Sequence, residues 1–248
     1  MNWLRTVRAE IRKLTSTKMP LAFLIVLGVI GAATASAVAF GTDMDGSKTF
    51  ISTAADQQSL IAFAANALVI AGLFGAIAVA REYGHGTVVL TFLTTPRRSR
   101  AVLAQYAAAC VAGSALGLVG AGVSAGSVAA GLNATDYGFM VSAADLAQVL
   151  AAATLAGGAG AVLGAGIGAF IRNTGGAVTG TILMLVILPP LAVQMAGETA
   201  SWVPGTVATV ASGVSDATGI GAAIAAIVMW ALVPAAIGLV AATRRDVV

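Results

Sequence analysis

The sequence predicts an all-α, polytopic membrane protein with six transmembrane helices, an N-terminal in-plane amphipathic helix and both termini in the cytoplasm. Of the 248 residues, 58% are hydrophobic and 9% are charged, whereas soluble domains carry about 25% charged residues. The mean hydropathy of +0.95 excludes a disordered chain, which needs low hydrophobicity and high charge. Charge-free runs of at least 18 residues, the length that crosses a bilayer as a helix, occur six times. The basic residues between these runs are distributed unevenly, which sets the orientation.

Residues 1–18 predict a helix that lies along the membrane surface. Its apolar residues recur at steps of three and four and so share one helical face: Trp3, Val7, Ile11 and Leu14. Its basic residues lie elsewhere around the helix: Arg5, Arg8, Arg12 and Lys13. A tryptophan at the headgroup boundary and basic residues facing anionic lipid are the requirements for such a helix. A basic tail that only sets the topology is the alternative interpretation.

The six charge-free runs are the predicted spans: residues 20–40, 59–80, 101–131, 146–171, 175–197 and 218–243. The first is too long for the hydrophobic region of a cleaved signal peptide, so we keep it as a span. The third would measure about 46 Å as one helix, which predicts a bend or a protruding end. One long helix is favoured there, because two spans would need about 40 residues.

Orientation follows from the rule that short loops rich in Lys and Arg stay cytoplasmic. With the N-terminus inside, twelve of the thirteen basic residues are cytoplasmic and only Lys48 is outside. The expected location is the plasma (inner) membrane. A nucleic-acid partner is excluded, because no basic groove interleaved with aromatic residues exists. A single cysteine and a single histidine, Cys110 and His85, leave no disulfide framework and predict no metal site.

The segment 81–100, between the second and third spans, predicts a structured cytoplasmic platform. Val88 to Leu93 form a short apolar helix candidate that cannot span and must pack against the membrane face or a protein. Pro96 is expected to end this helix, and Gly84 and Gly86 permit a tight bend before it. A lipid-facing loop whose arginines only set the topology is the alternative.

This segment resembles the coupling segment of ABC-2 type permeases. A glutamate follows the second span, a Gly-Thr pair lies four and five residues on, and an apolar stretch, a proline and an arginine come next: Glu82, Gly86-Thr87, Leu90, Pro96 and Arg98. Ser201-Trp202-Val203-Pro204 is similar to the short extracellular element of that family before the sixth span. Gln105 departs from the family, where a basic residue often begins the third span.

The resemblance implies a permease subunit of a bacterial ABC exporter that pairs with a second copy or a similar chain. It implies that the platform contacts a separate ATP-binding subunit through six residues: Glu82, Tyr83, Gly84, His85, Gly86 and Thr87. ATP and magnesium are then expected on that partner. This chain lacks the phosphate-binding motif G-x-x-x-x-G-K-[ST], so we expect it to hold no cofactor and to catalyse no ATP hydrolysis.

The cargo class follows from the composition of the spans. No charged residue lies in them, which disfavours ion- or proton-coupled transport. A lane lined by alanine, leucine, valine and a few amides suits an apolar or amphiphilic cargo, such as a drug, a peptide or a lipid-like molecule. The candidate residues for the cargo path are Asn66, Gln194 and Thr179. Hydrogen bonding between helices is the alternative role for each.

The glycines predict close helix packing. Gly160, Gly164 and Gly168 form a small-xxx-small ladder in the fourth span. Single steps of the same kind occur at Gly113/Gly117, Gly122/Gly126 and Gly176/Gly180. Pro189-Pro190 and Pro234 predict kinks in the fifth and sixth spans.

Two functions of other classes remain open at this point. A channel or facilitator that is not driven by ATP is one, and a membrane scaffold or sensor without cargo is the other. Neither accounts for the shaped segment after the second span as readily as the permease interpretation does.

Overall fold

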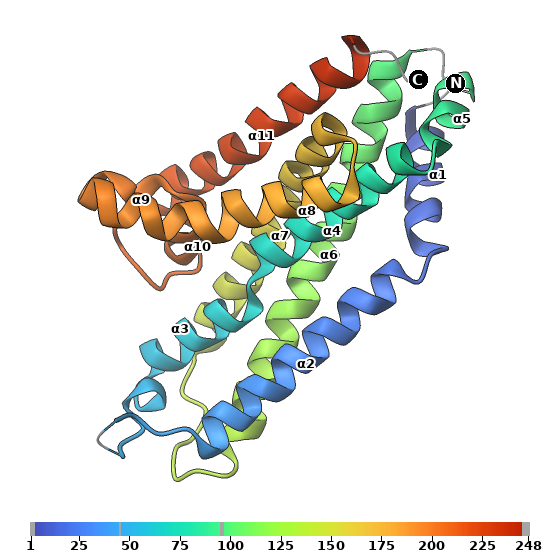
Figure 1. Cartoon of the computed structure of the whole chain (residues 1–248). Coiled ribbons are helices and arrows are strands. Elements are labelled where there is room, and N and C mark those ends of the chain that lie inside the picture. The colour runs from blue at the N-terminus through green and yellow to red at the C-terminus, as the bar shows by residue number, and fades with distance from the viewer. Residues whose placement is uncertain (1–2, 45, 95–96, 245–248) are drawn as a thin grey trace.

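The computed structural model describes residues 3–44, 46–94 and 97–244. Within these ranges the chain consists of helices and their connections, without a β-strand, and six of the helices are long and apolar enough to cross a membrane. They are α2 (Met19–Phe40), α3 with α4 (Ala54–Ala65 and Ala67–Gly84), α6 (Arg98–Leu132), α7 (Ala143–Ile171), α8 with η2 and α9 (Thr174–Ile182, Leu183–Ile187 and Leu188–Ala196), and α11 (Ile220–Arg244) (Figure 1). The predicted all-α membrane class with six candidate spans is confirmed at this level.

Shorter elements connect the long helices: α1 (Trp3–Thr15), η1 (Thr49–Ile51), α5 (Thr87–Thr94), η3 (Gly197–Trp202) and α10 (Pro204–Ala211). The short apolar helix predicted after the second span is therefore α5. Pro96, which was expected to end it, lies outside the described residues. The long third span is a single helix, as predicted.

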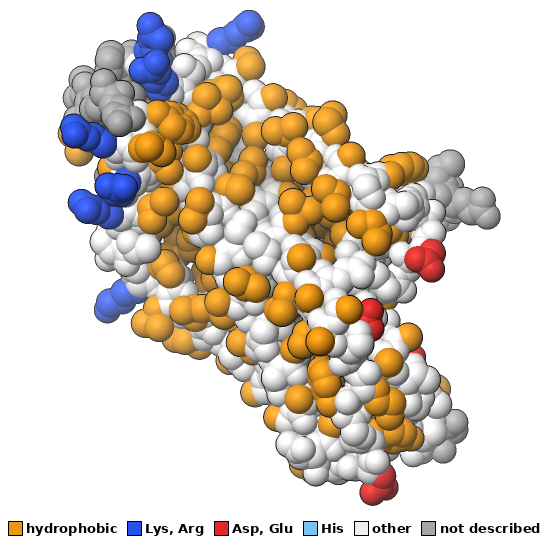
Figure 2. All heavy atoms as spheres, turned by 180° about the vertical axis from the view of Figure 1, so that it is seen from behind, with side chains coloured by type: hydrophobic (Ala, Val, Ile, Leu, Met, Phe, Trp, Pro, Cys, Tyr) orange, Lys and Arg blue, Asp and Glu red, His pale blue; other side chains and the backbone are white. Residues whose placement is uncertain are grey.

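The basic side chains gather at one end of the bundle, and most acidic side chains lie away from that end. In Figure 2 the lysines and arginines cluster at one end, while the visible aspartates and glutamates lie away from it. We call the end with α1, α5 and the first turn of α6 the basic end, and the end with the α2–α3 and α6–α7 connections the acidic end. The start of α1 and the end of α11 both lie at the basic end (Figure 1).

The central helix of the bundle is α7, which packs against α4, α6 and α11. The ladder Gly160, Gly164 and Gly168 places its Cα atoms against the backbone of α4, where an added Cβ would meet the carbonyls of Leu68, Gly72 and Ala76. These three glycines therefore let two helical backbones touch, as predicted. On α6, Gly113 and Gly117 approach α7 in the same way.

One of the predicted glycine steps does not pack helices together. A Cβ added at Gly122 or Gly126 would meet nothing within 4 Å, so this step faces outward from α6. A Cβ at Gly176 or Gly180 of α8 would meet side-chain atoms of α7, those of Ile171 at both positions and of Ile167 at Gly180, so this step lies against a second helix. The prediction is wrong for Gly122 and Gly126, because the spacing alone does not say which way a helix face points.

The second span is longer than predicted and is broken. It begins at Ala54, where the Thr53 and Asp56 side chains form a capping box, and it continues to Gly84 rather than ending at residue 80. At Asn66 the backbone enters the left-handed region, with φ 37° and ψ 38°. This conformation ends α3 and starts α4 inside the apolar run.

The prolines of the fifth and sixth spans, which predict kinks, differ in their effect on the helix. In the fifth span a π-helical turn, Leu183–Ile187, comes directly before Pro189-Pro190, because proline cannot supply the amide that regular helical bonding needs. In the sixth span α11 continues through Pro234. Its backbone there lies against Gly166 of α7, where a Cβ would collide with it.

Candidate functional site

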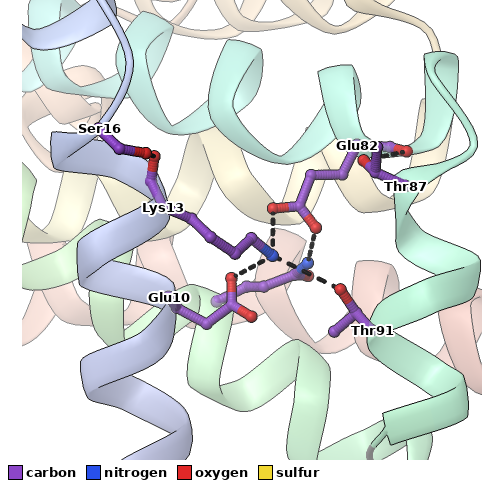
Figure 3. A network of polar contacts seen from close by, with 7 residues as sticks. Glu10, Lys13, Ser16, Glu82, Thr87 and Thr91 are labelled. Carbon is purple, nitrogen blue, oxygen red and sulfur yellow. Dashed lines mark hydrogen bonds and ion pairs between the residues drawn. The ribbon is translucent and has the colours of Figure 1, made fainter.

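A network of polar side chains joins four helices at the basic end (Figure 3). The Nζ atom of Lys13 lies 2.8 Å from Glu10 Oε2 and 2.8 Å from Glu82 Oε1. Gln105 donates from Nε2 to Glu82 Oε2 at 2.7 Å, and Lys13 donates to Thr91 Oγ1 at 3.5 Å. We call these five residues the basic-end network; they connect α1, α4, α5 and α6.

The sequence builds the network from short local patterns. Glu10 and Lys13 are three residues apart on α1, so their side chains meet on one flank of the helix. That flank, which includes Thr6, is buried, whereas Trp3 and Leu4 are exposed. Because α1 packs against α6, its polar flank faces the bundle.

Burial and charge act against each other in this network. Burial raises the pKa of Glu10, and the nearby Lys13 lowers it only in part. For Lys13, burial acts to lower the pKa, but hydrogen bonds to Glu10 and Glu82 outweigh it, so that the pKa is raised. Lys13 therefore stays charged between two carboxylates.

Gln105 is a buried amide, with 4% of its surface exposed. Its Nε2 donates to Glu82, while its Oε1 has no hydrogen-bond partner among the described residues. Gln105 thus occupies the position facing the Glu82 carboxylate. A neutral donor there leaves Lys13 as the one cation that bridges the two carboxylates in the described part of the chain.

The six residues predicted to contact an ATP-binding subunit divide into two groups. Glu82 and Tyr83 are partly buried, and the Arg172 guanidinium lies over the Tyr83 ring, 5.2 Å from its centroid. The remaining four are exposed and form the turn from α4 to α5: Gly84, His85, Gly86 and Thr87. Only these four are placed to touch a partner in this conformation, since both oxygens of the Glu82 carboxylate are engaged within the chain.

The turn and α5 present a shaped surface. Gly86 has φ +68°, a backbone conformation that glycine adopts without strain, and His85 Nδ1 lies 2.9 Å from the Arg81 carbonyl. On α5, Val88 is fully buried, while Val89 and Leu90 are 41% and 65% exposed. We call residues 84–87 together with Val89 and Leu90 the coupling tip.

A cavity of about 280 Å³ lies at the break in the second span. It is lined by the end of α3, the start of α4, α7, α10 and Leu185 of the π-helical turn, and it is partly open to the outside. Three side chains give it polar character: Asn66, Thr209 and Ser212. The Thr209 and Ser212 hydroxyls donate to carbonyls of α10, whereas the Asn66 side chain makes no hydrogen bond with the described residues. Irregular backbone at membrane depth is tolerated where it lines a cavity.

The structure does not bring the three predicted cargo-path residues together. All three side chains are exposed, but only Asn66 lines this cavity; Gln194 on α9 and Thr179 on α8 are not part of its lining. The polar residues that the cavity adds, Thr209 and Ser212, lie after the fifth predicted span. Sequence reasoning missed them because α10 is too short to register as a span.

The network residues Glu10, Lys13, Thr91 and Gln105 were also not predicted as a site. The available signal was the i, i+3 pair of opposite charges on a segment otherwise interpreted as membrane-facing.

The sequence matches no protein-family model and no curated protein. The fold therefore defines the class, an all-helical protein with six helices able to cross a membrane.

Proposed function

We propose that the chain is the permease subunit of an ATP-driven ABC transporter of the ABC-2 type. A separate ATP-binding subunit, carrying ATP and magnesium, docks on the coupling tip, and two permease subunits form the working unit. The basic end faces the cytoplasm, in agreement with the distribution of Lys and Arg. The location is the plasma (inner) membrane, and the cargo is exported.

The observation that carries this proposal is the link between the coupling tip and the spans. Thr91 of α5 and Glu82 of α4 share Lys13, and Glu82 also binds Gln105 of α6. A displacement of the coupling tip is therefore transmitted to α1, α4 and α6 together. Glu82 is then a positioning residue rather than a direct contact of the partner.

The partner can be tested by purifying the tagged chain from its native membranes. We expect a protein with the motif G-x-x-x-x-G-K-[ST] and ATPase activity to copurify. Val89→Asp places a charge on the coupling tip and should lower the yield of that protein about tenfold, or ~1.4 kcal/mol. Val89→Ile keeps the tip apolar and serves as the control.

The outcomes separate the proposed function from its alternatives. A purified chain that conducts a solute without any ATPase would be a channel or facilitator. An ATPase that remains bound to Val89→Asp as it does to Val89→Ile would move the docking surface away from the coupling tip.

We assign the cavity at Asn66 as the place where cargo binds, because it joins an apolar lining with one amide that has no partner in the described chain. An apolar pocket with a few polar groups is the usual form of a small-molecule site. The cargo is therefore an apolar or amphiphilic molecule that can hydrogen-bond to an amide.

Removing the Asn66 amide should change the cargo preference. Asn66→Gly keeps the left-handed backbone, which most other residues would strain, and removes one hydrogen bond, worth about 1 kcal/mol or ~5-fold in apparent affinity. We expect weaker efflux of cargo with a hydrogen-bonding group, normalised to folded protein, and no change for purely apolar cargo. Gln194→Ala, an exposed amide outside the cavity, is the control. Identical efflux profiles for Asn66→Gly and the wild type would remove Asn66 from the cargo site.

A further inference from the structure

An apolar crevice of about 340 Å³ is lined by residues of α1, α2, α4 and α6, beside the connection between α1 and α2. Its walls come from Ile11 and Leu14 of α1, Pro20 and Leu24 of α2, and Val111 and Ala115 of α6, among others. Thr15 is the one residue in the lining with a hydroxyl, and this hydroxyl donates to the carbonyls of its own helix. The crevice therefore offers water no free hydrogen-bonding group.

Small side chains on α6 create the crevice. Ala108, Ala112 and Ala115 face α1 at helical spacing, so α6 leaves room where larger residues would fill it. The deeper wall is Phe74 of α4, which is 1% exposed. Val111, Ala115 and Leu24 remain exposed within the crevice, so the space is open to an apolar occupant from outside the chain.

Two arginines border the crevice on α1. Arg8 and Arg12 are one helical turn apart, and each lies three residues before a residue of the lining, Ile11 or Thr15. Residues three apart are neighbours on a helix surface. Both arginines are exposed, and neither forms an ion pair with a described residue. The acidic residue of this helix, Glu10, is buried on the opposite flank with Lys13.

We propose that this crevice and its arginine border bind one phospholipid with an anionic headgroup. An acyl chain occupies the crevice, and the phosphate and the headgroup charge lie at Arg8 and Arg12. Arginine matches a phosphate in charge and geometry, and apolar area buried beside basic residues is how helices hold anionic lipid. A second copy of the chain is disfavoured as occupant, because a two-fold contact here would bring the same arginines toward one another.

The position of the site gives the lipid a structural role. Lys13, on the next flank of α1, belongs to the basic-end network. A lipid held between α1, α2 and α6 therefore stabilises the docked position of α1. This inference does not depend on an ATP-binding subunit or on a cargo.

The test uses the full chain in detergent, titrated with phosphatidylglycerol or phosphatidylcholine, with bound lipid counted by native mass spectrometry. We expect one tightly retained phosphatidylglycerol and weaker retention of phosphatidylcholine. Arg8→Gln with Arg12→Gln should weaken phosphatidylglycerol binding about tenfold and bring it to the level of phosphatidylcholine. Arg244→Gln, which makes the same kind of substitution at one exposed arginine of α11, should leave this site intact.

A second variant tests the crevice itself. Ala115 is exposed there, so Ala115→Phe fills the space without entering the helix packing and should remove tight binding of both lipids. Equal retention of the two lipids by the wild type, or phosphatidylglycerol retained by the arginine variant as tightly as by the wild type, would overturn the headgroup assignment. Unchanged retention by Ala115→Phe would place the lipid elsewhere, and a dimer that Ala115→Phe dissociates would make a second copy the occupant.

Discussion

Replacing Gly164 with alanine should lower the stability of the folded protein more than any other glycine-to-alanine substitution in the bundle. An added Cβ at Gly164 would collide with the backbone carbonyl oxygen of Gly72 on α4. No flexible side chain is present to move aside, so the whole of α4 must shift from α7. Overpacking costs about 1–3 kcal/mol, and we expect about 3 kcal/mol here, because the collision is between two backbones.

Gly122→Ala is the matched control for this prediction. It makes the same change on α6, where an added Cβ meets nothing within 4 Å, and alanine is favoured over glycine in a helix by about 1 kcal/mol. Heating in detergent followed by size-exclusion chromatography measures both variants. We expect the apparent melting temperature of Gly164→Ala to fall by about 6 °C or more, and that of Gly122→Ala to stay or rise. Equal melting curves would mean that α4 and α7 do not touch at Gly164.

These two glycines also show what the sequence could predict. Hydropathy and length were sufficient for the six spans, because an apolar run of that length has one stable form in a bilayer. Spacing identified Gly160, Gly164 and Gly168 as a packing ladder and equally favoured Gly122 and Gly126, which face outward. The direction of a helix face depends on its neighbours, and no local pattern contains that information.

The candidate site was predictable in part for the same reason. The segment 81–100 was found because its glycines, apolar helix and arginines are local features. The partners of Glu82 were not, since Lys13 and Gln105 come from helices 69 and 23 positions away in the chain. The left-handed backbone at Asn66 was also missed. Asparagine tolerates that conformation, but asparagine also occurs inside regular helices, so the residue alone does not predict a break.

In the segment 1–18 the sequence pattern favoured burial of one helix face, whereas the structure buries a different flank. Trp3, Val7, Ile11 and Leu14 share a face, which favoured a helix held by its apolar side. In the structure the buried flank is the one with Thr6 and Glu10. An ion pair on that flank is compatible with burial because Lys13 supplies the opposite charge.

Lys13→Met is expected to release α1 from the bundle. The change keeps an unbranched side chain but removes the cation between Glu10 and Glu82, whose side chains are only 8% and 13% exposed. The two carboxylates then face each other without a cation between them, and little water is present to screen their repulsion. Breaking a fully buried pair costs about 3–5 kcal/mol, and we expect about 2 kcal/mol, since the Lys13 side chain is 42% exposed and solvent screens part of the interaction.

The release can be measured at Thr6, which is 9% exposed on the buried flank of α1. In a Cys110→Ala background, Thr6→Cys should react slowly with a thiol reagent and much faster when Lys13→Met is added. Lys18→Met is the matched control, because it makes the same change at an exposed lysine that follows α1 and should leave Thr6→Cys protected. Adding Glu10→Gln to Lys13→Met removes one of the two facing charges and should restore much of the protection. If Lys18→Met exposes Thr6→Cys as strongly as Lys13→Met does, the loss of any positive charge near α1, rather than of the Glu10–Lys13–Glu82 contact, releases the helix.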